Sequence, residues 1–232
     1  MGALEWTYLG PVDYDRSLEL QDLQAARVAA GKPAKLLLLE HPPTITLGRH
    51  ADKAHLRLSE EELQRRGISI HRIKRGGDVT VHGPGQLVGY PIADLRRLGL
   101  SVPDWVQGNA RVLCEVLGDW GLAAVWSDLH PGVWVNGAKI AALGFRIVHG
   151  ISTHGFALNV DCDLAAFETI IPCGLPDLPV TSMQELGIVD CSPSDLVEKI
   201  AEAFARVFGF EAATQSAGTG REGEERALAS SC

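Results

Sequence analysis

The sequence predicts one α/β or α+β domain with a largely antiparallel sheet. First, segments with the apolar pattern of strands are interspersed with segments that have helical spacing. Second, Asn136-Gly137 separates two apolar segments, which is typical of a two-residue turn in an antiparallel hairpin. Third, no linker or internal repeat interrupts residues 1–211, and a chain of 232 residues can bury one sizeable core.

The predicted strands are short apolar segments bounded by Pro, Gly or Asn. They cover residues 4–9, 35–40, 44–47, 68–73, two segments within 78–91 around the turn Gly83-Pro84-Gly85, then 132–135, 138–148 and 152–161. The aliphatic run at 36–39 predicts a buried strand.

The predicted helices show helical spacing of apolar residues or a clear start signal. They cover residues 14–30, a short segment that ends at Gly67, then 101–120, 164–170 and 193–208. Gly31 ends the first helix, Ser59 and Glu62 form a capping box before the second, and Pro103 lies near the start of the third. Residues 212–232 are rich in Gly, Ser, Ala and Glu, which predicts a disordered tail.

The composition is that of an ordinary soluble protein, with 46% hydrophobic and 22% charged residues. No apolar run approaches the roughly 18 residues that a transmembrane helix needs, and no signal peptide is expected. The net charge of −8 argues against a nucleic-acid binder. Five cysteines without metal-ligand spacing indicate free thiols. We therefore expect a cytoplasmic protein that binds no metal, nucleic acid or membrane. We also expect a monomer, although none of these observations bears on the oligomeric state.

Three segments hold residues that suit chemistry: 75–86, 137–144, and 154–159 with 171–174 downstream. Each has an ordinary explanation, because glycine pairs form turns, strand lysines usually face solvent, and a cysteine after proline is usually inert. Together they offer a nucleophile, a cation or base, and a glycine-rich backbone that can lie against a ligand, as thiol-based acyl transfer requires.

The segments RGGDVTVHGPGQLVGYP, GAKIAALGFR, HGFALNVD, PCG and VTSM resemble those of the octanoyltransferases of lipoate biosynthesis, the lipoyl(octanoyl) transferase family. The match runs in order from about Leu37 to Met183. It implies a single catalytic domain over 1–211 with the fold of the biotin and lipoate protein ligases, a mixed sheet flanked by helices.

The resemblance also implies an activity without a cofactor. An octanoyl group would pass from octanoyl-acyl carrier protein, through a thioester on Cys173, to a lysine of a lipoyl domain. The acceptors would be 2-oxo acid dehydrogenase E2 subunits and the glycine cleavage H protein. Lys139 would be the partner of Cys173. The implied substrate-binding residues are Arg75, Gly76, Gly77, Asp78, Val79, Thr80, Val81, His82, Ala142, Leu143, Gly144, His154, Gly155 and Phe156.

Several alternatives stay open at this point. Lys139 could stabilise the Cys173 thiolate as an ammonium or act as a neutral base. His82 and His154 could donate to an oxyanion or hold a loop. The chain could instead be an ATP-dependent lipoate or biotin ligase, although such a ligase needs no cysteine nucleophile. It could also be a non-catalytic domain that binds acyl carrier protein or lipoyl domains.

Overall fold

The computed structural model describes residues 2–172, 178–211 and 213–216. Cys173 and most of the predicted tail therefore lie outside the described residues. An eight-stranded mixed sheet has the strand order β11-β1-β2-β6-β10-β9-β8-β7, and a three-stranded sheet has the order β4-β3-β5. The pairings are antiparallel except those of β1 with β2 and β11, and of β3 with β4. This confirms the predicted fold class.

The strands are β1 (Leu4–Pro11), β2 (Ala34–Glu40), β3 (Thr44–Leu47), β4 (Ser69–Arg72), β5 (Val79–His82), β6 (Gln86–Ile92), β7 (Val125–Ser127), β8 (Gly132–Val135), β9 (Ala138–Val148), β10 (Ile151–Asn159) and β11 (Ala213–Gln215). The helices are α1 (Tyr14–Ala29), α2 (Glu60–Arg65), α3 (Leu95–Leu98), α4 (Val102–Asp119) and α5 (Pro193–Phe208), with short 3₁₀ turns at Lys53–His55 and Leu164–Thr169. None of the helices among the described residues is long and apolar enough to cross a membrane.

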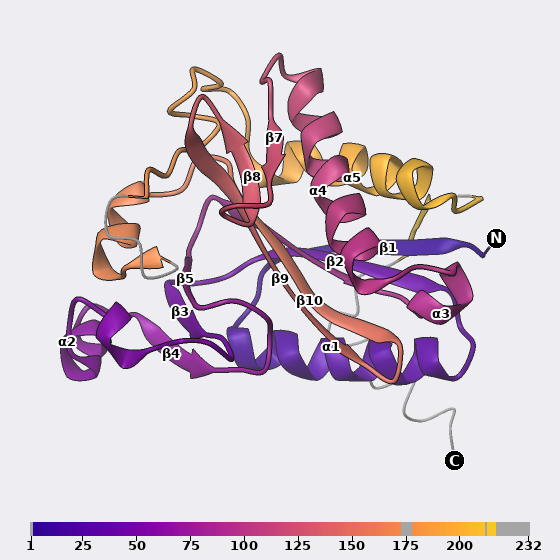
Figure 1. The fold of residues 1–232 in the computed structure, drawn as a ribbon, viewed down its shortest axis with the longest axis horizontal. Helices are drawn as coiled ribbons and strands as arrows, with labels where there is room; N and C mark the ends of the chain where they lie inside the picture. The colour runs from indigo at the N-terminus through magenta and orange to yellow at the C-terminus, as the bar shows by residue number, and fades with distance from the viewer. Residues whose placement is uncertain (1, 173–177, 212, 217–232) are drawn as a thin grey trace.

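Helices cover both faces of the large sheet, with α4 and α5 on one side and α1 on the other (Figure 1). Strand β2 shows why its aliphatic run is continuous. Leu36 and Leu38 belong to the core that includes α4 and α5, whereas Leu37 and Leu39 belong to the core that includes α1. A strand buried on both faces needs apolar residues at every position rather than at alternate ones.

The structure contains the predicted hairpin turn, and side chains cap the starts of three helices. Asn136 and Gly137 both have positive φ, 50° and 81°, as the two central residues of a type I′ turn require. Ser101 with Asp104, and Ser192 with Asp195, form capping boxes at the starts of α4 and α5. At the start of α2, the Ser59 side chain accepts a hydrogen bond from the Glu62 N–H, which is one of the two hydrogen bonds of the predicted capping box.

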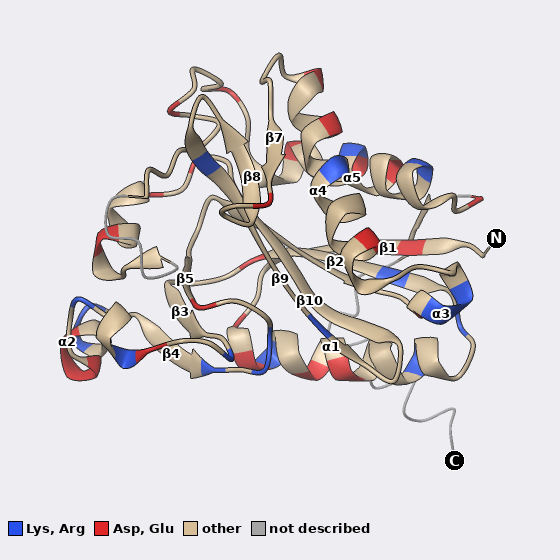
Figure 2. Cartoon of the chain, viewed as in Figure 1, with Lys and Arg blue, Asp and Glu red and all other residues tan. Residues whose placement is uncertain are grey.

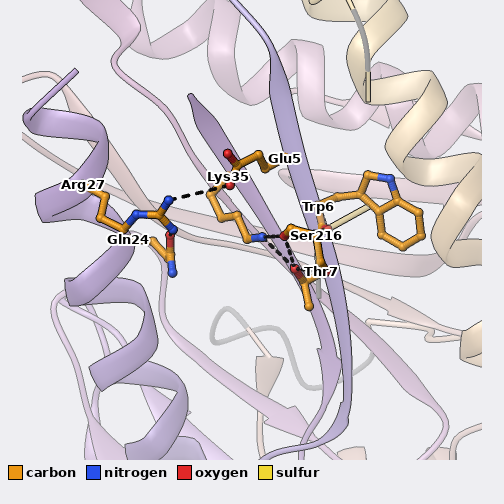
Figure 3. A network of polar contacts seen from close by, with 7 residues as sticks. All are labelled: Glu5, Trp6, Thr7, Gln24, Arg27, Lys35 and Ser216. Carbon is orange, nitrogen blue, oxygen red and sulfur yellow. Dashed lines mark hydrogen bonds and ion pairs between the residues drawn. The ribbon is translucent and has the colours of Figure 1, made fainter. Parts of the chain in front are cut away.

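The C-terminal boundary differs from the prediction. Residues 213–215 form β11, which pairs with β1 in parallel, so the sheet continues beyond residue 211. Figure 3 shows the contacts that fix this end of the chain: buried Lys35 donates hydrogen bonds to Thr7 and to the Ser216 hydroxyl. A segment without an apolar pattern is therefore held by backbone pairing and by one buried ammonium group.

Candidate active site

A cavity of about 450 Å³ lies on the side of the large sheet that α1 also covers. Its lining comes from β5, β6, β9 and β10, and from Tyr14 at the start of α1. The loops contribute His50 and His55, residues of the glycine loop at 75–78, and Pro172, Leu178 and Val180. Strand β10 carries no charged residue, and β9 carries only a lysine and an arginine (Figure 2). The surface of the cavity is mostly apolar, and the Lys, Arg, Asp and Glu residues that line it are Arg75, Asp78 and Lys139.

Pairs of small residues form the floor of the cavity. The β9–β10 register places Gly144 opposite Gly155 and Ala142 opposite Ala157. Because side chains alternate along a strand, these four residues share one face of the sheet. Their small side chains leave a trough above the backbone, and all four line the cavity.

Lys139 reaches this face because of a β-bulge. The β8–β9 pairing shifts by one residue between Val133↔Ala141 and Trp134↔Lys139. The shift breaks the alternation, so that Ile140 and Ala141 both enter the core on the α4 and α5 side. Without it, Lys139 would lie on the opposite face from Ala142 and Gly144. The Lys139 side chain is only 8% exposed, and its ammonium lies 5.3 Å from the centre of the Trp134 ring.

The segment after residues 173–177 runs beside Lys139. The Lys139 N–H donates to the Pro179 carbonyl at 2.8 Å, and the Thr181 N–H donates to the Lys139 carbonyl at 3.0 Å. Pro172 and Leu178, on either side of the undescribed segment, both line the cavity. The chain therefore enters and leaves this segment at the cavity that Lys139 lines.

Arg75 holds the glycine loop in place and is not a surface charge. It is 9% exposed, and its guanidinium donates to the Thr46 carbonyl and hydroxyl, each at 2.9 Å from Nη2. The Gly76 N–H donates to the Phe145 carbonyl at 2.9 Å, which ties the loop to β9. Gly144 permits this approach, because a Cβ there would lie 2.9 Å from the Gly76 carbonyl oxygen.

A chain of polar contacts crosses the site from His82. The Gln86 amide nitrogen donates to Asn159 Oδ1 at 2.9 Å, so the Gln86 oxygen faces His82 Nδ1, 2.8 Å away, and accepts its hydrogen. The Asn159 amide in turn donates to the Thr181 carbonyl at 2.9 Å. Burial, helped by His41, lowers the pKa of His82 to about 3. His82 is therefore neutral, its Nε2 is an acceptor, and the residue joins β5 to the segment beside Lys139.

His154 has an unusual backbone for a residue inside a strand. Its φ is +56°, whereas the other described non-glycine residues with positive φ, Asn136 and His149, lie in turns. Its N–H donates to Gln21 Oε1 of α1 at 2.8 Å. Burial, with Arg75 and Arg146 nearby, lowers the pKa of His154 to about 4.

Most of the predicted site residues meet at this cavity. Those that line it are Lys139, Arg75, Gly77, Asp78, Val79, Thr80, His82, Ala142, Leu143, Gly144, His154, Gly155 and Phe156. Gly76 and Val81 do not: Gly76 makes the backbone bond to β9, and Val81 packs in the core of the small sheet. Cys173 lies outside the described residues.

Sequence reasoning missed several lining residues. Tyr14, His50, His55, Tyr90 and Phe167 also line the cavity. Tyr14 begins a helix and Tyr90 lies inside a buried strand, and neither position carries a local signal. Within the described ranges, no group of three or more His, Cys, Asp and Glu side chains is placed to hold a metal ion.

A comparison with protein families matches residues 13–205 to the lipoyl protein ligase A/B catalytic domain. The chain belongs to this family. The lipoyl protein ligase A/B match spans α1 to α5 and includes every lining residue named above.

Curated relatives and solved structures agree with the family. The chain is 47% identical over 204 residues to an octanoyltransferase of Solibacter usitatus, covering 88% of this chain and 92% of the relative. It is 40% identical over 212 residues to a mitochondrial octanoyltransferase of Arabidopsis thaliana, covering 90% of each. A crystal structure of lipoate-protein ligase A bound with ATP shares the fold, with a TM-score of 0.74, 15% identity, and coverage of 100% of this chain and 95% of that one. The predicted likeness to the lipoate ligases is confirmed.

Proposed function

We propose that the protein is an octanoyltransferase that passes an octanoyl group from a thioester donor to a lysine of a lipoyl domain. The observation that carries the proposal is the identity of 40–47% to proteins named octanoyltransferase, over most of both chains. A mostly apolar cavity with a buried lysine suits this substrate. Burying about seven chain carbons contributes roughly 6 kcal/mol at about 0.8 kcal/mol each.

Cys173 is the proposed nucleophile. The three cysteines that the structure describes support this choice, because their thiols are poorly suited to the role. Burial raises the pKa of Cys162 to about 12 and that of Cys191 to about 11, and it raises the pKa of Cys114 as well. A thiol with a raised pKa forms little thiolate at neutral pH. None of these three cysteines lines the cavity, whereas Pro172, the neighbour of Cys173, does.

The proposed reaction has two acyl transfers. The Cys173 thiolate attacks the donor's carbonyl carbon, and the donor thiol leaves with a proton. The amine of the acceptor lysine then attacks the acyl-enzyme thioester, forming an amide and releasing the Cys173 thiol. In this proposal Lys139 balances the thiolate charge and exchanges these protons. Its burial at the cavity, beside residues 179–181, supports this role.

Neither the Gly76 N–H nor His82 offers a free donor to an oxyanion. The Gly76 N–H is bonded to Phe145, and His82 presents an acceptor nitrogen at Nε2. An oxyanion needs donors. His82 is thus better explained as the residue that links β5 to the segment beside Lys139.

The donor, the acceptor and the acyl-enzyme can be tested together. We would incubate the protein with octanoyl-acyl carrier protein, measure intact mass, and then add a lipoyl domain without ATP. The wild type and Cys162→Ala should gain one octanoyl group and pass it on, whereas Cys173→Ala should gain none. If the Cys173→Ala variant still gained an octanoyl group, Cys173 would not be the nucleophile.

The same experiment addresses an ATP-dependent ligase. The likeness to the ATP-bound ligase, at 15% identity, shows the fold alone. If octanoylation of the lipoyl domain required free octanoate and ATP, and the thioester donor gave none, the ligase would be the better description. If acyl carrier protein bound without any gain of mass or transfer, the protein would be a binding domain.

A further inference from the structure

A second, smaller cavity lies beyond the main one along the same strands. Its volume is about 250 Å³, and Arg146 of β9 and Thr153 of β10 line it. The register pairs these two residues directly, and the next pair on the same face, Gly144 with Gly155, lines the main cavity. The two cavities are therefore consecutive along one face of the sheet.

His154 lines both cavities. In a regular strand, its side chain would point away from the face of Thr153 and Gly155. The φ of +56° breaks this rule and allows the imidazole to stand between the cavities. A non-glycine residue in this region is strained and persists only where the surroundings enforce it. Here α1 helps to enforce it, through the hydrogen bond from the His154 N–H to Gln21.

The second cavity is polar, unlike the main one. Lys74 and Arg72 line it with Arg146. Two buried polar atoms, Gln21 Nε2 and His154 Nδ1, have no hydrogen-bond partner among the described residues. Gln21 is 2% exposed and also lines this cavity. Such a site favours water or a polar group over a hydrocarbon chain.

We propose that His154 is the end wall of the acyl cavity and sets the length of acyl chain that the enzyme accepts. The proposal rests on the octanoyl transfer described above. An acyl chain whose carbonyl lies near Lys139 runs over Ala142 and Gly144 and meets the imidazole before Arg146. A longer chain must displace His154 and enter the polar cavity.

The test measures chain-length preference in His154→Gly. Glycine removes the wall and adopts a positive φ without strain. The matched control is His149→Gly, which removes a histidine of similar φ, 51°, from the exposed β9–β10 turn. We would measure kcat/KM for thioesters with 6, 8, 10 and 12 carbons. Because each buried methylene strengthens binding by about fourfold, the 12-to-8-carbon ratio should rise at least tenfold in His154→Gly and stay unchanged in His149→Gly.

Binding of free fatty acids of the same lengths, measured by calorimetry, is read in parallel. This binding measurement requires no turnover. If His154→Gly does not fold, His154→Asn replaces it, because asparagine has a smaller side chain than histidine and tolerates positive φ. An unchanged length preference in a folded variant would overturn the end-wall role. If the wild type bound medium-chain acids but formed no acyl-enzyme from any thioester, the proposed transfer function would be wrong. The end-wall role of His154 would then be decided by the binding data alone.

Discussion

Lys139 and His154 both line the cavity because the regular alternation of side chains is broken in their strands. Each lies in a strand whose strict alternation would turn its side chain to the other face. A one-residue bulge redirects Lys139, and a positive φ redirects His154. Bulges and strained residues often occur beside active sites because they re-aim a side chain at a local cost in stability. Lys139 and His154 therefore share a kind of local distortion that is common beside active sites.

Gly144→Ala should weaken both stability and substrate binding. The new Cβ would lie 2.9 Å from the Gly76 carbonyl oxygen and 3.2 Å from Arg75 Cδ, so the glycine loop must move. We expect a loss of about 1–3 kcal/mol in the free energy of unfolding and a higher KM for the octanoyl donor. Urea unfolding and steady-state kinetics measure these two effects.

A matched control exists in α4. A Cβ at Gly118 meets nothing within 4 Å, and Gly118 has no positive φ, so Gly118→Ala should raise stability by about 0.5–1 kcal/mol and leave KM unchanged. If Gly144→Ala behaved like Gly118→Ala, the tight approach of the glycine loop to β9 would be incorrect.

At the scale of elements, β11 depends on few contacts. Its three residues pair with β1, and the Ser216 hydroxyl bonds to the Thr7 hydroxyl at 2.8 Å and to the Lys35 ammonium. Lys35 is 5% exposed, and burial lowers its pKa to about 8. The ammonium group therefore relies on the hydroxyl groups of Thr7 and Ser216 to offset its lost hydration (Figure 3).

A chain that ends at residue 210 should be less stable than one that ends at 216. The shorter chain lacks the β11 ladder and leaves Lys35 without the Ser216 hydroxyl. We expect a difference of about 1–3 kcal/mol in the free energy of unfolding, measured by urea titration of both chains. In the longer chain, Ser216→Ala should account for only part of that difference. Equal stabilities would show that β11 contributes nothing and that the domain ends near the predicted residue 211.

On the scale of the whole molecule, buried histidines make the fold sensitive to acid. His41 is fully buried, and its ring nitrogens lie 2.7 Å from the Val12 carbonyl and from the Tyr90 hydroxyl. Burial lowers its pKa to about 4, close to the value for His154 and above that for His82. All three are neutral in the folded protein at neutral pH.

The free energy of unfolding should fall as the pH is lowered from 6.5 to 5. An unfolded histidine takes up a proton near pH 6.5, whereas these three stay neutral in the fold until about pH 3–4. The stability they support is therefore complete above pH 6.5 and is lost on acidification, by about 2 kcal/mol for each histidine at pH 5. Urea unfolding at several pH values measures the slope.

A comparison of two variants tests whether His41 contributes to this pH dependence of the free energy of unfolding. His41→Asn should reduce the dependence on pH between 6.5 and 5, whatever its absolute stability. His149→Asn, at an exposed position with positive φ, should leave the slope as in the wild type. Equal slopes in both variants would mean that folding does not lower the pKa of His41.

Local sequence patterns predicted the main helices and strands, because each pattern reflects the burial and capping of neighbouring residues. The 36–39 run, the Asn136-Gly137 turn and the starts of α4 and α5 are examples. The short elements α3, β7 and β11 were missed. Segments of three or four residues carry too little periodicity, and β11 is fixed by pairing with β1 more than 200 positions away.

The sequence by itself determined the family, the fold class and most of the residues that gather at the cavity, because long motifs retain their chemistry and order. Only the tertiary structure decided how these residues face one another. The bulge that turns Lys139 inward, the burial of Arg75 against Thr46, and the place of His154 between two cavities each depend on pairing between distant strands. The physical reason is that side-chain direction in a sheet is set by register and backbone angles, which neighbouring residues in the sequence do not specify.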